Sequence, residues 1–568
     1  MESYPIQVAL NKLKSRLKRL ITLSCLFILS NVVACCNDPL STDGEDPEPK
    51  PETPEAAPAK GYYLSREGDD TNPGTREKPW RSLEKLNGVD LEPGETVYLE
   101  GGATFPGTLI LDLLDSGSKG KAVTITSYGT GPATIDGGAK EAVIIKSSFF
   151  RLKGVNARGA GRKEGNTSNG IELQKASDGT LEQVTVEGFQ HTGLMLYSCH
   201  NVEAVKVVAK NNGFCGIFVT GAYQYKQGRY IFPDIDADCS KNITLRDCLV
   251  ENNAGDPSVT DNSSGSGILV EMTKGALIDH CVATNNGWDM PRGGNGPVGI
   301  WTHSSDSVTI QHCISYRNKT SPNGHDGGGF ALDGGVTNSV IQYCLSYENE
   351  GAGYGLYQWS GAMDWNNNTV RYSISINDAI EGNKDGIGYG SFTFWNGSGE
   401  HKQYRDCFIH NNLIYNNISP ITRYIGGNNF NFGIYNNIFI GRGEIIAGSS
   451  PGYRFMGNTY WNLTGSSIYF GGYGSLQEWA NATGQEKLEG RLLGTYADPL
   501  LNGHLTISLT DPYQMGSLSG FKLQPTSPVK DKGLDLQTLF KLKLPVQDFF
   551  GNPAFRGIAP EPGIHELE

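Results

Sequence analysis

One segment recurs along this chain with a period of roughly thirty residues, and this recurrence constrains the fold more than any other feature. Each copy carries Cys or Ser, with Asn or Asp at a fixed offset behind it. The copies are LRDCLVENN (245–253), IDHCVATNN (278–286), IQHCISYRN (310–318), IQYCLSYEN (341–349), VRYSISIND (370–378) and YRDCFIHNN (404–412). A second motif that begins with Gly lies between them, as in GILVE (267–271), GIWTH (299–303) and GFALD (329–333). Short strands at this period, with Asn or Gly at the turns, are typical of a parallel β-helix.

We therefore predict an all-β protein, a parallel β-helix whose inward side chains pack against the coils above and below. Gly at 74 of 568 residues and charged residues at only 19% agree with a turn-rich β solenoid. The alignment of the copies places Cys248, Cys281, Cys313, Cys344 and Cys407 in one column, with Ser373 in the remaining place. It predicts buried, reduced thiols rather than disulfides. The following Asn or Asp residues, from Asn253 to Asn412, are expected to form an amide ladder.

The N-terminus has the pattern of an exported bacterial protein. Basic residues at 11–20 precede a short apolar run at 21–34, which is typical of a signal peptide. The run ends in VVACC, which resembles a lipobox and implies a lipid on Cys35. An ordinary signal peptide beside an incidental Cys pair is the alternative. The acidic, Pro-rich segment 35–60 then predicts a flexible tether.

These features predict a lipoprotein of the bacterial outer membrane, on its periplasmic face or at the cell surface. The net charge of −13 disfavours nucleic acid and anionic membrane surfaces as partners. The membrane is therefore expected to be contacted only through the lipid anchor. We expect a monomer.

Both ends of the folded part resemble a known group of proteins. Residues 61–136, with a short helix near 79–87 and a first strand at PGETVYL, resemble the opening of secreted bacterial right-handed β-helix carbohydrate-active proteins. The final segment, which ends in PGIHELE, resembles their closing segment. The resemblance implies a right-handed parallel β-helix domain at 61–495 and a C-terminal capping segment at 496–568. It implies action on a glycan without fixing the reaction, because this fold carries glycoside hydrolases, polysaccharide lyases and adhesins.

Strand alternation predicts which side chains of the Gly-led motif point outward. Counted from the leading Gly, the fourth positions give an outward ladder that contains Glu271, His303, Asp333 and Trp359. The second positions include Trp301 and Tyr357. Carboxylates and an imidazole beside aromatic rings suit a carbohydrate site, where rings stack on sugars and carboxylates move protons.

Long loops precede several of these strands and are expected to form the walls of a cleft. They lie at 254–266, 287–298, 319–328 and 379–389. Insertions in a solenoid often mark the binding face. We therefore predict Asp289, Arg292 and His325 as substrate contacts, together with Trp359, Trp301 and Tyr357.

The stretch HDGGGFALDGG (325–335) combines two acids with five glycines. Asp333 belongs to the outward ladder, and Asp326 lies where the loop joins the strand. A loop that doubles back could pair the two as the carboxyl groups of a glycosidase. Their seven-residue spacing is similar to that of the β-helical lacto-N-biosidases, which implies acid/base and nucleophile roles for Asp326 and Asp333. Glu271 is the alternative partner for Asp333.

The sequence therefore predicts a glycoside hydrolase that acts on an extracellular polysaccharide or oligosaccharide, with Asp333, Asp326, Glu271 and His303 as candidate catalytic residues. A polysaccharide lyase is the first alternative, since His303 lies next to Asp333 in the ladder. A non-catalytic, glycan-binding solenoid is the second. We expect no cofactor for a hydrolase, although a lyase could use Ca²⁺. The sequence has no motif with metal-ligand spacing.

Overall fold

The computed structural model describes residues 61–567 apart from 227–228, 234–235, 381–382, 385–386, 399–403, 418, 426–428, 443, 449–451, 465–469 and 504. The predicted signal peptide 1–34, Cys35 and the tether up to residue 60 lie outside the described residues. Within the described part, no helix combines the length and apolar character needed to cross a lipid bilayer.

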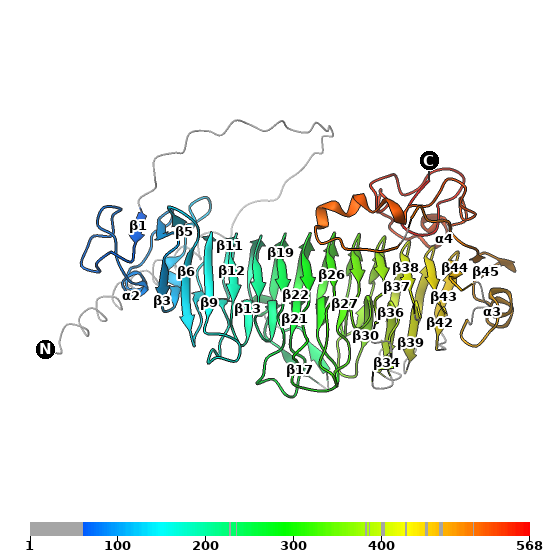
Figure 1. The fold of residues 1–568 in the computed structure, drawn as a ribbon, viewed down its shortest axis with the longest axis horizontal. Coiled ribbons are helices and arrows are strands. Elements are labelled where there is room, and N and C mark those ends of the chain that lie inside the picture. Colours follow the sequence, from blue (N-terminus) through cyan, green and yellow to red (C-terminus); the bar gives the residue numbers. More distant parts are fainter. Residues whose placement is uncertain are drawn as a thin grey trace, which may run out of the picture.

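Three long parallel sheets wind around one core to form an elongated β-helix (Figure 1). Sheet A consists of β1 (Gly61–Leu64), β2 (Thr96–Glu100), β5 (Val123–Tyr128), β8 (Phe150–Lys153), β11 (Ser177–Glu182), β14 (His200–Val205), β19 (Ser240–Arg246), β22 (Thr273–Asp279), β25 (Asp306–Gln311), β28 (Val340–Gln342), β31 (Trp365–Asn366), β32 (Thr369–Arg371), β37 (Tyr404–His410), β40 (Phe430–Tyr435) and β43 (Tyr453–Met456). 

Sheet B follows sheet A in each coil. It consists of β3 (Thr104–Pro106), β6 (Ala133–Gly138), β9 (Val155–Gly159), β12 (Thr185–Glu187), β15 (Val208–Lys210), β20 (Leu249–Glu251), β23 (Val282–Thr284), β26 (Ile314–Tyr316), β29 (Leu345–Tyr347), β33 (Ile374–Ile376), β38 (Leu413–Asn416), β41 (Ile438–Gly441), β44 (Thr459–Asn462) and β47 (Thr495–Tyr496).

Sheet C completes the coil and carries the Gly-led motifs. It consists of β4 (Leu109–Leu111), β7 (Val143–Ile145), β10 (Ile171–Gln174), β13 (Thr192–Tyr197), β16 (Cys215–Thr220), β21 (Ser266–Val270), β24 (Val298–Thr302), β27 (Gly328–Leu332), β30 (Tyr354–Gln358), β36 (Phe392–Asn396), β39 (Ile421–Ile425) and β42 (Ile446–Ala447).

Other elements are short. The two-stranded ribbons are β17 (Gln224–Lys226) with β18 (Arg229–Ile231), β34 (Asn383–Lys384) with β35 (Ile387–Gly388), and β45 (Lys487–Leu488) with β46 (Arg491–Leu492). The helices are α2 (Leu83–Asn87), α3 (Leu476–Thr483), α4 (Leu536–Phe540) and the 3₁₀ turns η1 (Leu113–Asp115), η2 (Asp236–Asp238), η4 (Pro512–Ser517) and η5 (Ser519–Phe521).

Alternation within each strand fills the core, as the sequence predicts. In β25, Val308 and Ile310 are buried, whereas the residues between and beside them are partly or fully exposed. Register pairs apolar residues with apolar residues, so that Ile278 meets Ile310 and Ile310 meets Ile341. Each inward side chain therefore stacks on its counterparts in the neighbouring coils, and the single core runs the length of the solenoid.

The predicted turn ladders are present. The Asn253 side-chain amide donates to Asn286 Oδ1 at 2.9 Å, and Asn286, Asn318 and Asn349 continue the chain until Asp378 accepts the last bond at 2.7 Å. All eight cysteines in the described residues are buried and unpaired. The amides of this ladder are thus satisfied by coil-to-coil hydrogen bonds, which offset the cost of burying them.

The last sequence copy does not align as predicted. Strand β37 pairs with both β31 and β32, so Trp365 meets Tyr404 and Thr369 meets Phe408. Asn412, rather than Cys407, therefore continues the Cys column, and the Ser373 backbone N–H donates to Asn412 Oδ1 at 3.0 Å. Strand β37 keeps one register with β31 and β32, so the match of YRDCFIHNN to VRYSISIND is displaced by five residues from the structural alignment. Cys407 is nevertheless buried.

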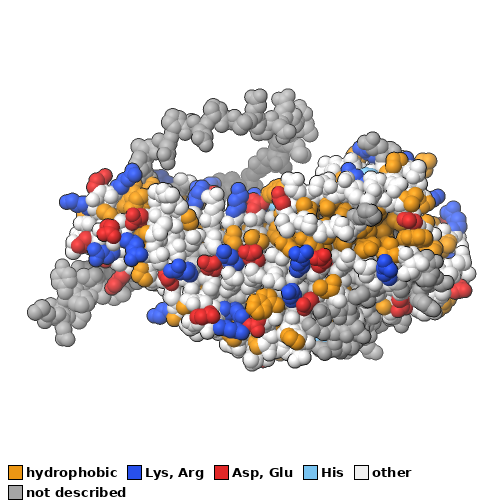
Figure 2. Space-filling model, in the orientation of Figure 1, with side chains coloured by type: hydrophobic (Ala, Val, Ile, Leu, Met, Phe, Trp, Pro, Cys, Tyr) orange, Lys and Arg blue, Asp and Glu red, His pale blue; other side chains and the backbone are white. Residues whose placement is uncertain are grey.

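The C-terminal segment, expected as a cap, lies along the flank of the solenoid (Figure 1). Met515, Phe521 and Leu523 pack in one apolar cluster with the outward residues of sheet B, among them Ile314 and Leu345. Figure 2 shows hydrophobic side chains gathered along this part of the molecule. The end of the coil is covered instead by α3, whose Trp479 stacks on Phe470 at 5.4 Å.

Candidate active site on the outer face of sheet C

The register of sheet C places six outward side chains in one ladder, one from each coil. Val219, Val270, Thr302, Leu332 and Leu356 are matched from strand to strand, and the ladder residues follow each of them directly. Tyr357 is matched in turn to Trp395. In order, the ladder is Thr220, Glu271, His303, Asp333, Tyr357 and Trp395. The adjacency predicted for Glu271, His303 and Asp333 is therefore present.

The prediction for the next coil is wrong by two residues. Gly353 and Gly355 are two positions apart, and the structure matches Phe330 with Tyr354, which makes Gly353 the leading Gly. Tyr357 is therefore the ladder residue beside Asp333, and Trp359 lies beyond the strand. In the following coil, Phe394 is matched with Leu356 and is fully buried, so Trp395 is the ladder residue. Sequence alone could not choose between two equally spaced glycines.

Glu271 and His303 form a buried ion pair at the centre of the ladder. His303 Nε2 lies 2.8 Å from Glu271 Oε2, and the Thr220 hydroxyl donates to Glu271 Oε1 at 2.6 Å. The Tyr223 phenol also hydrogen-bonds this carboxylate. With only 6% of Glu271 exposed, its charge is stabilised by these neighbours rather than by water.

The pKa values of Glu271 and His303 shift in opposite directions. Burial would raise the pKa of Glu271, but the charge and hydrogen bond of His303, followed by those of Thr220 and Tyr223, bring it below its ordinary value. Burial would lower the pKa of His303, but Glu271 and the nearby Asp333 raise it. Both side chains therefore favour their charged forms.

Asp333 is the ladder residue whose carboxyl group has a strongly raised pKa. It is partly buried, and its Oδ1 accepts the Gly334 backbone N–H at 2.6 Å. Loss of solvent raises the pKa of Asp333 to about 6, against the opposing charge of His303. The charge of Asp326 adds to the increase. Asp333 can therefore exchange a proton near neutral pH, as a catalytic carboxyl group must.

Asp326 lies two residues before β27, the strand that Asp333 directly follows, and has a left-handed conformation with φ 60°. Its Oδ2 accepts the Gly296 backbone N–H at 2.9 Å. The Tyr389 hydroxyl accepts from the Asp326 backbone N–H at 2.9 Å and donates to its Oδ1 at 3.3 Å. Burial raises the pKa of this carboxyl group. Because its charge influences Asp333, the two acids share one electrostatic environment.

The aromatic residues predicted to bind substrate differ in accessibility. Trp301 is 7% exposed and its indole N–H donates to Ser266 at 3.0 Å, so it is a structural residue packed 5.2 Å from the His303 ring. Tyr357 and Trp359 are partly exposed. Trp359 lies against Gly334, where a Cβ atom would come within 2.2 Å of its Nε1. Trp359 therefore borders Asp333, although it is not in the ladder.

A hairpin that the sequence analysis did not single out stands beside the ladder. It is formed by β17 and β18 and carries Tyr223, Tyr225 and Tyr230. The Tyr230 ring makes edge contacts with Tyr225 at 5.1 Å and with Trp359 at 5.6 Å. Tyr225 is 63% exposed. The alternation of Tyr in AYQYK followed by RYIF was the available signal for a short hairpin.

The three predicted loop contacts are placed less directly. Asp289 is held by Arg162 and Lys163, each at 2.5 Å, and these neighbours keep its pKa low in spite of burial. Arg292 donates to the Asp261 carbonyl oxygen at 2.7 Å and to Asn295. His325 lies next to Asp326 and its charge lowers the pKa of that acid. Of these three residues, His325 is therefore the one whose described contacts reach Asp326.

The residues suited to hold a metal lie elsewhere. Asp279, His280 and His312 bring one ligand atom each within 4.8 Å of the others, at the end of sheet A. This group was not anticipated, because its residues come from two different coils and have no recognisable spacing as a motif. Asp326, Asp333 and the aromatic hairpin of β17 and β18 together form the candidate active site.

Several known carbohydrate-active proteins are similar to this chain in sequence or in fold. A curated lacto-N-biosidase from Bifidobacterium longum subsp. longum is 41% identical over 71 residues, which is 12% of this chain and only 4% of that protein. A solved lacto-N-biosidase of group GH136 from Eubacterium ramulus is 18% identical, with a TM-score of 0.49 over 65% of this chain and 67% of that one. The pectate lyase Pel9A is 14% identical, with a TM-score of 0.45 over 90% of this chain and 97% of that one.

The family match covers a larger part of the sequence. A family described as "Pel9A-like, right handed beta helix region" matches residues 62–383, which is more than half of the chain. The matched range includes every ladder residue from Thr220 to Tyr357. It also agrees with the parallel sheets and the repeat, and it supplies the predicted handedness. The chain belongs to the Pel9A-like family of right-handed β-helix proteins.

Proposed function

We propose that this protein is a carbohydrate-active enzyme, a glycoside hydrolase that cleaves a glycosidic bond in an extracellular polysaccharide or oligosaccharide. One observation carries the proposal: Asp333, with its pKa raised to about 6, is flanked in the ladder by the charged His303 and the aromatic Tyr357. A rigid sheet holds all three. Burial also raises the pKa of Asp378 to about 6 in the Asn ladder, but that carboxyl group accepts hydrogen bonds from Asn349 and Ser375 in the interior. Asp333 instead lies on the outer face beside a charged imidazole, where a substrate could exchange a proton with it.

Asp333 and Asp326 divide the work that a glycosidase assigns to two carboxyl groups. Asp333 is ionised above about pH 6 and serves as the nucleophile at C1 or as the base that activates water. Asp326, whose pKa is raised by burial, donates a proton to the leaving oxygen. The leaving-group dependence described in the Discussion tests this division.

Glu271 and His303 act as positioning residues under this proposal. The Glu271 carboxylate fixes one ring nitrogen of His303 and keeps the imidazole protonated. The positive charge then lowers the pKa of Asp333 and keeps this acid ionised at neutral pH. The buried pair thus tunes the residue that reacts.

Aromatic rings supply the sugar-binding surface. Trp395, which is 40% exposed, continues the ladder beyond Tyr357, and Trp359 and Tyr225 stand on the hairpin side. Exposed rings on a rigid support stack against the apolar faces of sugars. The local match to a lacto-N-biosidase supports glycoside hydrolysis, although it spans a small part of that protein.

His303 argues against a lyase that uses histidine as its base. Such a base must be neutral before it removes a proton from a uronate. Glu271 occupies Nε2 of His303 and raises its pKa, which opposes that state. The lyase alternative is therefore kept as a second possible outcome of the glycan-panel assay described next.

A glycan panel tests the proposed reaction. Purified protein is incubated with neutral and uronate-containing polysaccharides and oligosaccharides, and the Asp326→Asn/Asp333→Asn double variant serves as the blank. New reducing ends without ultraviolet-absorbing unsaturated products are expected. Unsaturated ends would instead identify a lyase, and tight binding without any product would identify a binding solenoid.

We also propose that the chain is exported and held at the outer membrane by a lipid on Cys35, with 35–60 as the tether. The basic and apolar segments before VVACC support this. In Cys35→Ser, the protein should leave the membrane fraction while keeping its activity, because one lipid anchor holds it there. Membrane retention of Cys35→Ser would contradict the anchor.

A further inference from the structure

Two histidines and an aspartate meet at the corner between sheets A and B. Asp279 is the last residue of β22, and His280 follows it in a left-handed turn with φ 52°. His312 occupies the same turn position on the next coil, with φ 51°. Cys281 and Cys313, directly after the two histidines, are stacked in the interior. The backbone register therefore fixes the spacing of the two imidazoles.

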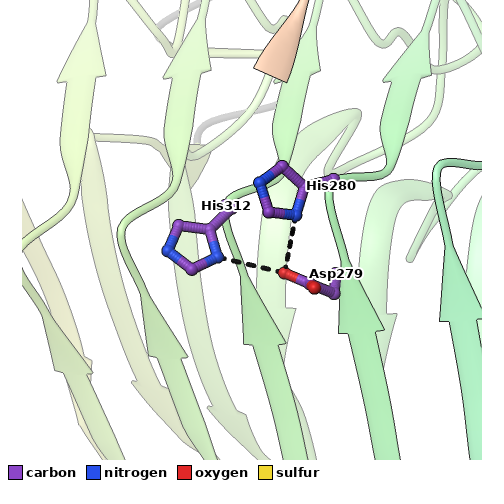
Figure 3. A group of neighbouring side chains, drawn as sticks. All are labelled: Asp279, His280 and His312. Atoms are coloured by element: carbon purple, nitrogen blue, oxygen red, sulfur yellow. Dashed lines mark hydrogen bonds and ion pairs between the residues drawn. The ribbon is translucent and has the colours of Figure 1, made fainter. Parts of the chain in front are cut away.

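Both rings direct a nitrogen at one carboxylate oxygen (Figure 3). His280 Nδ1 lies 2.9 Å from Asp279 Oδ1, and His312 Nδ1 lies 3.0 Å from the same oxygen. In a tetrahedral zinc site with bonds of about 2.0–2.1 Å, the ligand atoms are about 3.3 Å apart. Small side-chain rotations would therefore bring these three atoms into coordination distance of one ion.

We propose that Asp279, His280 and His312 form a binding site for a divalent transition metal, with Zn²⁺ as the best match. Two imidazoles and one carboxylate suit Zn²⁺ and related ions, whereas Ca²⁺ and Mg²⁺ prefer oxygen ligands alone. Among the described residues, this is the one group of three or more His, Cys, Asp or Glu whose ligand atoms converge in this way.

The surroundings of the site favour binding by preorganisation. The Tyr513 ring stacks on His280 at 4.2 Å, and the Tyr343 ring stacks on His312 at 5.3 Å. These contacts restrict the imidazoles before any ion arrives. Arg246 Nε lies 3.8 Å from Asp279 Oδ2, the oxygen that does not face the histidines, and Gln311 donates to Oδ1 at 3.3 Å. The Gln311 amide must turn away when a metal binds.

The site is separate from the proposed active site. Glu271 lies just before β22 and Asp279 ends it, so the strand of seven residues separates them by roughly 20 Å. The metal would instead tie two coils together beneath the C-terminal segment. Tyr513 belongs to that segment, and its hydroxyl donates to Asp247 Oδ1 at 2.6 Å. A metal-bound His280 would present a fixed surface to Tyr513.

Zinc titration of the full chain tests the proposal. Protein stripped with a chelator is titrated with Zn²⁺ by calorimetry, and thermal unfolding is followed with and without the ion. We compare the wild type with Asp279→Asn, His280→Gln and His312→Gln, and with His200→Gln as the matched control on sheet A. Because Cys35 and Cys36 can also bind Zn²⁺ when they are not lipidated, the readout is the difference between proteins.

One additional Zn²⁺ per chain and a higher Tm are expected in the wild type and in His200→Gln. Each ligand variant should lower the affinity of this site by at least about 100-fold and should lose the increase in Tm. The variants change partly exposed side chains, and cooperative unfolding without metal verifies that they fold. Equal Zn²⁺ uptake by all five proteins would overturn the site, as would uptake that disappears only when Cys35 and Cys36 are replaced.

Discussion

Two ladders of polar side chains run along this solenoid, one inside a turn and one outside sheet C, and both repeat once per coil. In the inner ladder, Asn286, Asn318 and Asn349 are chemically identical and pass hydrogen bonds of 2.9 Å from one to the next. In the outer ladder, Glu271, His303 and Asp333 differ from coil to coil, and Glu271 and His303 form an ion pair of 2.8 Å.

The difference shows what repetition does in a β-helix. Identical residues stack because each satisfies its neighbour, so a repeated column stabilises the fold. Where the residues of a column differ from coil to coil, these hydrogen bonds between identical neighbours are lost. Such a column must therefore be retained for another reason. In this protein the irregular column is bordered by an aromatic hairpin and by long loops, and it holds the buried Glu271–His303 ion pair beside Asp333. Function is therefore expected where the repeat breaks.

Replacement of Asp326 should have a large effect on turnover, of the same order as replacement of Asp333. Asp326→Asn should reduce turnover by about 10²–10⁴-fold, because the proton donor is lost. Substrates with a good leaving group should lose much less, since they need little protonation. Steady-state kinetics with a good and a poor leaving group measures this. Equal losses on both substrates would remove Asp326 from the role of acid.

Replacement of Glu271 should affect the reaction through His303. In Glu271→Gln the imidazole loses the partner that raises its pKa, so it stays neutral to lower pH and no longer supports the Asp333 anion. We expect turnover at neutral pH to fall by about 10- to 100-fold. The acid limb of the pH–rate profile should move to higher pH. An unchanged limb would show that the ion pair is only structural.

Replacement of Asn318 should affect stability without affecting chemistry. Asn318→Ala removes the side-chain acceptor of the Asn286 amide and the side-chain donor to Asn349 Oδ1. The Asn286 amide keeps its bond to the Val250 carbonyl, and Asn349 Oδ1 keeps the backbone N–H of residue 318. The free energy of unfolding should fall by about 1–3 kcal/mol. Asn323→Ala, at an exposed loop position, is the matched control. Denaturant unfolding and kcat are measured together. Loss of kcat in a folded Asn318→Ala protein would contradict the assignment of stability to the inner ladder and of chemistry to the outer one.

The sequence predicted the solenoid well because its repeat records the coil directly. The Cys column, the Asn ladder and the outward adjacency of Glu271, His303 and Asp333 all follow from a fixed period. Prediction failed where the period changed. Gly353 and Gly355 offered two registers, and the match of YRDCFIHNN to VRYSISIND placed Cys407 where the structure has Asn412.

Contacts between distant segments could not be predicted at all. The hairpin of Tyr223 and Tyr230 reaches Glu271 and Trp359 through tertiary packing. His280 and His312 meet Asp279 only because adjacent coils are in register. The flank position of the C-terminal segment likewise depends on an apolar surface that forms only after the coils stack.

The most direct test of the account is a paired measurement of activity and stability in Asp333→Asn. The native state raises the pKa of Asp333 from 3.8 to about 6, so the native protein holds this proton more tightly than the unfolded chain does. Ionisation across that range therefore costs stability as the pH rises, and a neutral Asn avoids the cost. At pH 7 on a confirmed substrate, the account predicts a loss of kcat of about 10²–10⁴-fold with a Tm equal to or above that of the wild type. Near-normal turnover, or inactivity that comes with a clearly lower Tm, would contradict it.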